Sequence, residues 1–404
     1  MEAQETVYSS ESGAMVTQAI GLLAEGSARQ LLELLTPVIG IIEKRHTLPV
    51  LARVLVRRVG WEVSATSSDL ELEYTNFGRL GAETGGAASA VDALGIVKVL
   101  KGLERNEHVK LLAEPERTRL VRGVCNYALQ AHRAEDFPLA YSTGREDPDD
   151  VPAKVEIGAK DLQFALQSIC KAMGVNDARI CLNGAVLKLG RSTATLVGSN
   201  GHWLAKCEIG STHDPKDIGS QWILPRKAIL ETLRSIKTYA GPVQLVAGPH
   251  STRASLFFGH LVLQTRLLEG RYPDFERLLA PRDGAFASVE LPRAETVAAL
   301  RRLKPAASEK YPGVALTIGH GTCSLRVEGS ESEAVEEVLV NYEGDVVNVG
   351  VNINYLTDVL ESVNCESATM TVHDEGKSSR AWGMMRVAYR KYPGFEALVM
   401  PMRV

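Results

Sequence analysis

The stretch GAKDLQFALQSICKAMG, residues 158–174, decides the fold because its pattern returns twice more in the chain. Its apolar residues recur every three or four positions, which predicts an amphipathic helix with one buried face. A stretch of the same kind, GSARQLLELLTPVIGIIEK, begins at Gly26, and a third, LPRAETVAALRRLKPA, begins at Leu291. The three starts are separated by nearly equal intervals, which indicates a tandem repeat of one structural unit.

A second set of helical stretches repeats with nearly the same spacing. It consists of VDALGIVKVLKGL from Val91, LPRKAILETLRSIK from Leu224 and VNINYLTDVLESV from Val351. Aromatic segments recur as well, as AEDFPLA, GRYPDFERLL and RKYPGFEALVMP. Features that return three times at one period indicate triplication of a whole domain.

Between the predicted helices, apolar and polar residues alternate, which is typical of half-buried strands joined by turns. Examples are VLVRRVGWEVSATSSDLELEY and AVLKLGRSTATLVGSNGHWLAKCEIG. Each repeat therefore predicts an α+β domain in which antiparallel sheets bury their apolar faces against two helices. The predicted domains are 27–141, 153–280 and 285–404, with linkers rich in proline, glycine and charge, and residues 1–26 are expected to form a mobile extension.

Composition narrows the class of protein. The 404 residues are 45% hydrophobic and 23% charged, and no segment is apolar for long enough to span a membrane. The N-terminus has Glu2, Glu5 and Glu11 and no basic residue before its first apolar stretch, so a secretory signal is not expected and a cytoplasmic location is. The six cysteines contain no C-x-x-C pair, so neither a zinc site nor a disulfide framework is predicted.

Charge is distributed unevenly along the chain. The formal net charge is −4, yet the predicted helices and the residues next to them carry more lysine and arginine than aspartate and glutamate. Basic helices on an otherwise acidic body predict an electropositive surface that can attract phosphates without reading base sequence. Ordinary solvated helix faces are the alternative interpretation for any single helix.

Signs of catalysis are weak. His202 lies near Ser199 and Asn200, but no matched base or nucleophile accompanies it, and a hydrolase that uses His202 is a distant alternative. No phosphate-binding G-x-x-x-x-G-K-[ST] motif is present, and the acidic residues show no two-metal cluster. The sequence therefore predicts no catalytic residue, no metal and no cofactor.

Several motifs resemble the bacterial DNA polymerase III β subunit, the sliding clamp family. The resemblance runs in order from about Ser27 to the last residue and covers all three repeats. The motifs are RHTLPVLARVLV from Arg45, SSDLELEY from Ser67, CLNGAVL from Cys181, SNGHWLAKC from Ser199, PRKAILE from Pro225, EGRYPDFERLL from Glu269, NINYLTDVLES from Asn352 and the terminal VMPMRV.

The resemblance implies a non-catalytic accessory subunit of a DNA polymerase holoenzyme, associated with the nucleoid. Two half-ring subunits would join head to tail into a closed homodimeric ring around double-stranded DNA, with the helices inside and the sheets outside. A clamp-loader ATPase would load the ring, and no membrane contact is implied. The positions that match DNA-facing residues of the family are Arg45, Asn176, Arg179, Arg226 and Lys227.

The resemblance also implies a peptide-binding groove between the second and third domains. The DNA polymerase III α subunit and other polymerases would dock there through short clamp-binding peptides. An apolar groove lined by flexible methionines suits varied apolar side chains. The matched positions are Leu182, Ser199, Gly201, His202, Trp203, Leu204, Pro273, Arg277, Leu278, Asn352, Tyr355, Leu398, Val399, Met400, Pro401, Met402 and Arg403.

Three residues depart from the family pattern. Trp203 stands where an arginine is common, Asn200 where an aspartate is common, and Leu94 where a basic residue is common. A second interpretation therefore stays open beside the replicative clamp. It is a divergent clamp paralogue that serves repair polymerases or competes for clamp-binding peptides.

Overall fold

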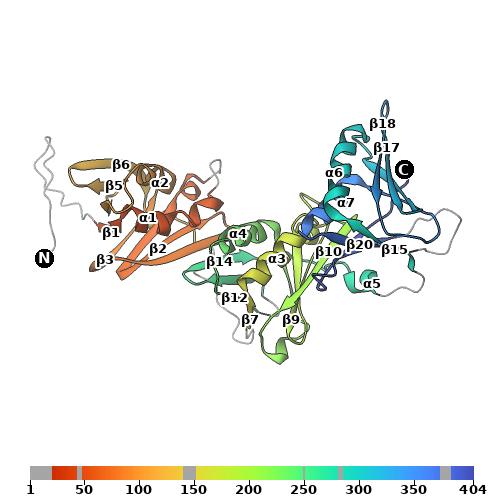
Figure 1. Ribbon diagram of the computed structural model, residues 1–404. Helices are drawn as coiled ribbons and strands as arrows, with labels where there is room; N and C mark the ends of the chain where they lie inside the picture. Colours follow the sequence, from red (N-terminus) through yellow and green to blue (C-terminus); the bar gives the residue numbers. More distant parts are fainter. Residues whose placement is uncertain (1–20, 43–47, 140–151, 249–250, 281–284, 374–383) are drawn as a thin grey trace, which may run out of the picture. The chain divides into compact units, whose positions relative to one another are not determined.

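The computed structural model describes residues 21–42, 48–139, 152–248, 251–280, 285–373 and 384–404. The chain divides into two compact units (Figure 1). Unit 1 comprises Met1–Pro152 and Val243–Arg266, and unit 2 comprises Ala153–Pro242 and Leu267–Val404.

Unit 1 is built on one antiparallel sheet with the strand order β1-β4-β5-β6-β3-β14-β13-β12, and β2 pairs with β3 beside this path. The helices α1 and α2 pack against each other, and α1 also packs on β1 and β3. The bounds are β1 Gly21–Ser27, α1 Ala28–Leu35, β2 Val54–Ser68, β3 Leu72–Val91, α2 Ala93–Lys101, β4 His108–Ala113, β5 Arg117–Arg122, β6 Cys125–His132, β12 Pro242–Ala247, β13 Arg253–Phe258 and β14 Leu261–Arg266.

The helix starts in unit 1 follow from local capping. The Ser27 hydroxyl accepts a hydrogen bond from the Gln30 amide at 3.3 Å, and the Gln30 side chain accepts one from the Ser27 amide at 2.9 Å. This reciprocal pair satisfies amides that have no partner inside α1. Asp92 caps α2 by a single bond, because its carboxylate accepts from the Gly95 amide at 3.0 Å.

Unit 2 contains an eight-stranded sheet, β11-β8-β9-β10-β22-β21-β20-β15, and a four-stranded sheet, β18-β17-β16-β19. Its helices α3 and α4 pack against each other, as do α6 and α7. The bounds are β7 Ala153–Gly158, α3 Ala159–Ile169, β8 Gly184–Leu189, β9 Thr193–Ser199, β10 Trp203–Gly210, β11 Gln221–Pro225, α4 Arg226–Ile236, α5 Phe275–Leu279, β15 Ala285–Pro292, α6 Arg293–Leu303, β16 Gly313–Gly319, β17 Thr322–Glu328, β18 Glu333–Leu339, β19 Val347–Asn352, α7 Ile353–Ser362, β20 Ser367–His373, β21 Met385–Ala388 and β22 Phe395–Val399.

Sheets continue from one sequence repeat into the next. In unit 1, β3 of the first repeat pairs with β14 of the second, from Leu72↔Thr265 to Asn76↔Leu261. In unit 2, β10 of the second repeat pairs with β22 of the third, from Trp203↔Val399 to Cys207↔Phe395. Because β12, β13 and β14 are joined to β3 in this way, they belong to unit 1 although the sequence places them in the second predicted domain.

The structure confirms the six predicted helices as α1, α2, α3, α4, α6 and α7. Each buries the apolar stripe that predicted it; in α3, for example, Leu162, Ala165, Leu166 and Ile169 are buried. The short helix α5 was not predicted, because five residues do not show a helical period.

The predicted extension differs from the structure at its end. Residues 21–26, assigned to the extension, form most of strand β1, which pairs with β4 and buries Leu23 and Ala24. Residues 1–20 lie outside the described residues. The boundaries of the three predicted domains stay a prediction.

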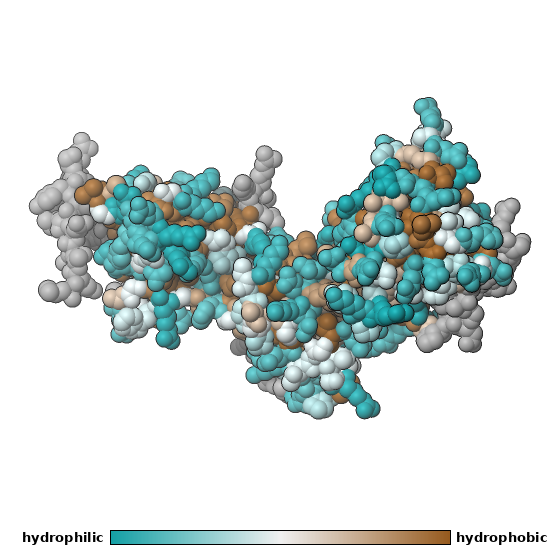
Figure 2. Space-filling model, viewed as in Figure 1, coloured by the Kyte–Doolittle hydropathy of each residue, from teal (hydrophilic) through white to brown (hydrophobic). Residues whose placement is uncertain are grey.

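The surface is mixed. On the face that Figure 2 shows, hydrophilic residues cover most of the molecule, and hydrophobic ones gather in small patches. Among the described residues, no helix combines the length and the apolar character that a membrane crossing requires.

Candidate functional site

The C-terminal segment of the chain is held by strands from two sheets of unit 2. Strand β22 pairs with β10, and directly beyond it the Met400 amide donates to the His202 carbonyl at 2.9 Å. The Met402 amide then donates to the Gly350 carbonyl at 2.8 Å, and Pro401 bridges to Val351. These bonds hold the terminal segment in place although Met400 and Val404 stay exposed, whereas Leu398 and Val399 just before it are buried.

A tight turn precedes β10 and lies next to that segment. The Asn200 side-chain oxygen accepts hydrogen bonds from the amides of His202 at 2.9 Å and Trp203 at 3.1 Å. Gly201 has φ +83°, and a Cβ there would come within 2.6 Å of the Arg179 guanidinium. Glycine adopts this backbone geometry without strain, whereas any side chain here would be strained and would also displace the Arg179 guanidinium.

Arg179 covers the turn and is held by two groups. Its guanidinium pairs with Asp177 at 2.9 Å and donates to the Asn200 carbonyl at 3.0 Å. The hydrogen bonds from Arg179 lower the pKa of the Asp177 carboxyl from 3.8 to about 2. Asp177 therefore stays ionised and keeps Arg179 in place at neutral pH.

Three aromatic rings meet beside the turn. The Tyr355 ring, on α7, stacks with the His202 ring at 6.0 Å between centroids and with the Trp203 ring at 6.4 Å. Trp203 is only 2% exposed. Its ring is therefore covered by the protein itself, and Tyr355 is one of the residues that pack on it. Aromatic pairs at such distances are favourable when they are offset.

An apolar cluster lies under the same region. Tyr272 and Phe275 join it from the segment around α5, next to the predicted residues Pro273, Arg277 and Leu278. Burial raises the pKa of the Tyr272 hydroxyl well above its ordinary value. The cluster consists of Leu182, Val186, Val197, Leu204, Ile223, Tyr272 and Phe275, with Cys181, Leu268 and Leu279 packed against it.

The predicted peptide-binding residues thus fall into buried, half-buried and exposed members; Ser199 and Trp203 are among the buried ones, and Leu278, Tyr355, Pro401 and Met402 are among the half-buried ones. Leu182, Leu204, Leu398 and Val399 are buried, whereas Asn352 is half-buried and caps α7 by accepting from the Asn354 amide at 2.9 Å. The exposed members are Gly201, His202, Pro273, Arg277, Met400 and Arg403. Met400 is 43% exposed although its backbone is bonded, so its side chain is available to a ligand.

The predicted DNA-binding residues occupy two neighbouring places in unit 2, except Arg45, which lies outside the described residues. Asn176 and Arg179 are exposed on the loop after α3, and Asn176 has φ +54°. Arg226 and Lys227 begin α4 and are half-buried. The Arg226 guanidinium donates a hydrogen bond to the Cys170 carbonyl at 2.9 Å. One of its N–H groups is therefore already bonded to the backbone at the end of α3.

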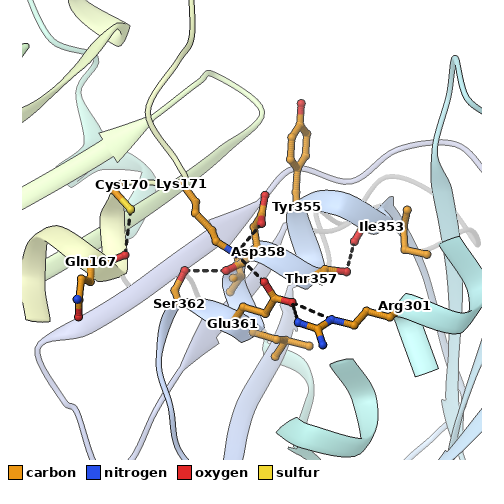
Figure 3. Close-up of polar contacts among 12 residues, drawn as sticks. Gln167, Cys170, Lys171, Arg301, Ile353, Tyr355, Thr357, Asp358, Glu361 and Ser362 are labelled. Atoms are coloured by element: carbon orange, nitrogen blue, oxygen red, sulfur yellow. Dashed lines mark hydrogen bonds and ion pairs between the residues drawn. The ribbon is translucent and has the colours of Figure 1, made fainter. Parts of the chain in front are cut away.

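Sequence reasoning missed an ion-pair cluster in unit 2, which we call the Lys171 cluster (Figure 3). The Lys171 ammonium lies 3.0 Å from the Asp358 carboxylate and 2.6 Å from that of Glu361. Arg301 pairs with Glu361 at 2.7 Å. The available signal was slight: Asp358 and Glu361 are the two charged residues of α7 and lie three positions apart, on one helix face.

The described residues contain no group of three or more His, Cys, Asp or Glu side chains that could hold a metal ion. Burial raises the pKa of the Cys207 thiol to about 11 and that of Cys323 to about 12, so neither thiol is activated.

Known proteins resemble the chain over its length. Models of the DNA polymerase III beta subunit match it with the N-terminal domain at residues 27–141, the central domain at 156–274 and the C-terminal domain at 279–403. A beta sliding clamp of Pseudomonas putida is 31% identical over 375 residues, which cover 93% of this chain and 98% of the relative. One of Escherichia coli K12 is 27% identical over 381 residues, with the same coverage.

Solved structures agree with these matches. The crystal structure of a sliding clamp (DNA polymerase III subunit beta) from Pseudomonas aeruginosa bound to griselimycin superposes with a TM-score of 0.85 at 30% identity, covering 95% of this chain and 100% of that one. The repeated helix pairs, the continuous sheets and these similarities lead to one conclusion. The chain belongs to the β sliding clamp (DNA polymerase III β subunit) family.

Proposed function

We propose that this protein is a DNA sliding clamp, a processivity factor that encircles duplex DNA and tethers the replicative polymerase. The observation that carries the proposal is the threefold recurrence of a helix pair packed on antiparallel strands, with a positive summed charge over the six helices. Two subunits would close head to tail into a ring, which a loader ATPase opens on DNA. A closed ring holds DNA by enclosure, so it needs no tight contact with the bases.

The charge of the helices supports contact with DNA. On the six predicted helices, basic side chains outnumber acidic ones, whereas the whole chain has a net charge of −4. Phosphate contacts of this kind attract a duplex without sequence preference and allow it to slide. Exposed basic side chains on these helices are Arg29, Lys98, Lys101, Lys160, Arg234, Arg301 and Arg302.

An acidic sheet edge in unit 2, and in unit 1 a partly unpaired strand next to a strand rich in arginine, support ring closure. Strand β18 ends the four-stranded sheet and carries Glu333 and Glu337, with Leu339 76% exposed. Strand β6 pairs with β3 only at its last two residues, and the neighbouring β5 carries Arg117, Arg119 and Arg122. The acidic edge of one subunit can pair with the open side of β6 in the other, next to the arginines of β5, and a head-to-tail contact of this type closes a ring when the rotation permits.

The region around Tyr355 supports a peptide-binding role. It combines a buried apolar floor with exposed Met400 and His202 and the half-buried Tyr355 ring. Sites that recognise short peptides are usually largely apolar with few polar anchors. Clamp-binding peptides of the DNA polymerase III α subunit and of other replication and repair proteins are the ligands that we propose.

The ring is tested by topology. The protein is loaded onto nicked circular DNA with its cognate loader, washed in high salt, and the DNA is then linearised. If the ring encloses the DNA, the protein should stay bound through the high-salt wash. It should be lost after linearisation, because the ring can then slide off the DNA ends.

Purely electrostatic binding behaves differently, since affinity for DNA falls steeply with salt. Loss in the salt wash, or retention after linearisation, would contradict the proposal. DNA linearised before loading is the matched control.

A further inference from the structure

The Lys171 cluster joins two helices that come from different sequence repeats. Lys171 follows α3 in the second repeat, whereas Asp358 and Glu361 lie on α7 in the third, and the Lys171–Glu361 bond spans 190 positions of sequence. Figure 3 shows the Lys171 side chain reaching to both carboxylates of α7, with Arg301 on the far side of Glu361. The cluster is therefore a polar connection between two packed helices of unit 2.

Each of the two helix ends is also fixed within its own repeat by an arginine. The Arg226 guanidinium donates to the carbonyls of Cys170 at 2.9 Å and Met173 at 3.4 Å, which flank Lys171. The Arg293 guanidinium donates to the Cys365 carbonyl at 2.8 Å and to that of Leu360 at 3.3 Å, at the end of α7. Because both ends are held, the Lys171 ion pairs act on the relative placement of α3 and α7.

Tyr355 lies on the same helix as the two carboxylates. It precedes Asp358 by three positions and lies beside it on α7, whereas Glu361, six positions on, lies about 120° from Tyr355 around the helix axis. The Tyr355 ring stacks with the rings of His202 and Trp203, which precede and begin β10, and β10 packs against α3. Any shift of α7 relative to α3 therefore moves the Tyr355 ring relative to His202 and Trp203.

The electrostatics of the cluster favour its charged state. Burial alone would lower the pKa of Lys171, but hydrogen bonds to Glu361 and Asp358 outweigh burial and raise this pKa. The hydrogen bond from Lys171 in turn lowers the pKa of Glu361. The side chains are only partly covered, with Lys171 38% and Glu361 22% exposed, so solvent screens the attraction and each pair has a modest effect.

We propose that the Lys171 cluster positions Tyr355 over His202 and Trp203, and so sets the affinity of the clamp for peptides. Lys171 is a positioning residue that acts through α7 and does not itself touch the ligand. The inference rests on the proposed peptide-binding function. It concerns the orientation of one aromatic wall of that site.

The test begins with Lys171→Met, which keeps the length of the side chain and removes its charge. The probe is a fluorescein-labelled synthetic peptide with the clamp-binding sequence of the cognate polymerase III α subunit, followed by fluorescence anisotropy. We expect about two- to five-fold weaker binding, the range of partly exposed ion pairs, and Lys171→Arg should restore wild-type affinity. Lys110→Met is the matched control, because Lys110 forms a 3.0 Å ion pair with Glu25 in unit 1. The affinity of this variant for the peptide should be unchanged.

A double-mutant cycle separates positioning from general loosening. If Lys171 acts through Tyr355, Lys171→Met should have no further effect in a Tyr355→Ala background. Equal losses in both backgrounds, or an unchanged affinity of Lys171→Met, would overturn the inference while leaving the peptide site in place. Absence of wild-type binding to the peptide would instead overturn the proposed site itself, so the two failures are distinguishable.

Discussion

Two connections join the second and third repeats within unit 2, and they differ in kind. The apolar joint is the pairing of β10 with β22, where Leu204, Leu398 and Val399 are buried. The polar joint is the Lys171 cluster, whose side chains are partly exposed. Both connect the same two repeats, yet only one removes a large apolar area from water.

The difference teaches a division of roles. Burial of apolar side chains on a hydrogen-bonded sheet supplies most of the stability of a joint, because the hydrophobic contribution grows with buried area. Partly exposed ion pairs contribute about 0–1 kcal/mol each, but they depend strongly on geometry. The apolar joint therefore holds the two repeats together, and the polar joint adjusts the angle at which α7 meets α3.

The largest expected effect comes from the apolar joint. Phe395 on β22 is 1% exposed, and its ring lies 5.4 Å from that of Tyr389. Replacing Phe395 with Ala should destabilise the joint by about 3–5 kcal/mol, because a large buried ring is lost and a cavity remains. Hydrogen exchange of the β10 and β22 amides should accelerate accordingly.

Phe395→Leu is the milder control and should lie between the wild type and Phe395→Ala. Lys171→Met should accelerate the same amides far less. If both variants loosened the sheet equally, the division between the two joints would be refuted.

A smaller effect is expected at the end of the apolar joint. Deleting residues 400–404 removes the bonds from Met400 to His202 and from Met402 to Gly350, together with the exposed methionine. Binding of a polymerase tail peptide should weaken by more than about ten-fold, corresponding to roughly 1.4 kcal/mol or more, while the dimer that we propose should stay intact. Fluorescence anisotropy and sedimentation velocity measure the two properties, and unchanged peptide affinity would place the binding site elsewhere.

The smallest expected effect is the pH dependence of the polar joint. Lys171 lowers the pKa of Glu361 below 4.5. The contribution of this carboxylate to the stability of the cluster is therefore complete above pH 4.5 and is lost as the pH falls through the lowered pKa. The pKa of Lys171 is raised above 10.5. The contribution of its ammonium to the stability of the cluster is therefore complete below pH 10.5 and is lost as the pH rises through the raised pKa. The peptide affinity ratio of wild type to Lys171→Met should therefore be constant between about pH 5.5 and 9.

As the pH falls through the lowered pKa of Glu361, this ratio should decrease toward one, because one of the two carboxylates that Lys171 contacts is then neutral. Anisotropy titrations at fixed ionic strength provide the measurement. A ratio that changed between about pH 5.5 and 9 would contradict the assignment of the pH dependence to the cluster.

Local patterns predicted most of the secondary structure. The helices were recognisable because an apolar stripe at helical spacing is a property of ten or so consecutive residues. The strands around Gly184–Leu189 and Trp203–Gly210 were recognisable from alternation. Helix α5 and the early start of β1 could not be recognised from the sequence. A five-residue helix and a short strand next to the predicted extension carry too little periodic signal.

The candidate site was predicted through resemblance, and its geometry was not. Ser199, Trp203 and Leu398 could be named from motifs, but burial of Trp203 against Tyr355 depends on where α7 packs. The use of Asn352 as the cap of α7 likewise requires the helix to begin there. The contacts of Lys171 could not be anticipated, since no local pattern links it to α7.

The sequence by itself determined a triplicated α+β unit, its six amphipathic helices and a basic bias on those helices, because these features depend on residues close together in the chain. Only the tertiary structure decided how strands of one repeat pair with those of the next and which charges meet. Lys171 and Glu361 are 190 positions apart and come into contact because β10 and β22 share a sheet and thereby bring their helices together. Long-range contacts of this kind depend on the path of the whole chain, and that path is fixed by packing.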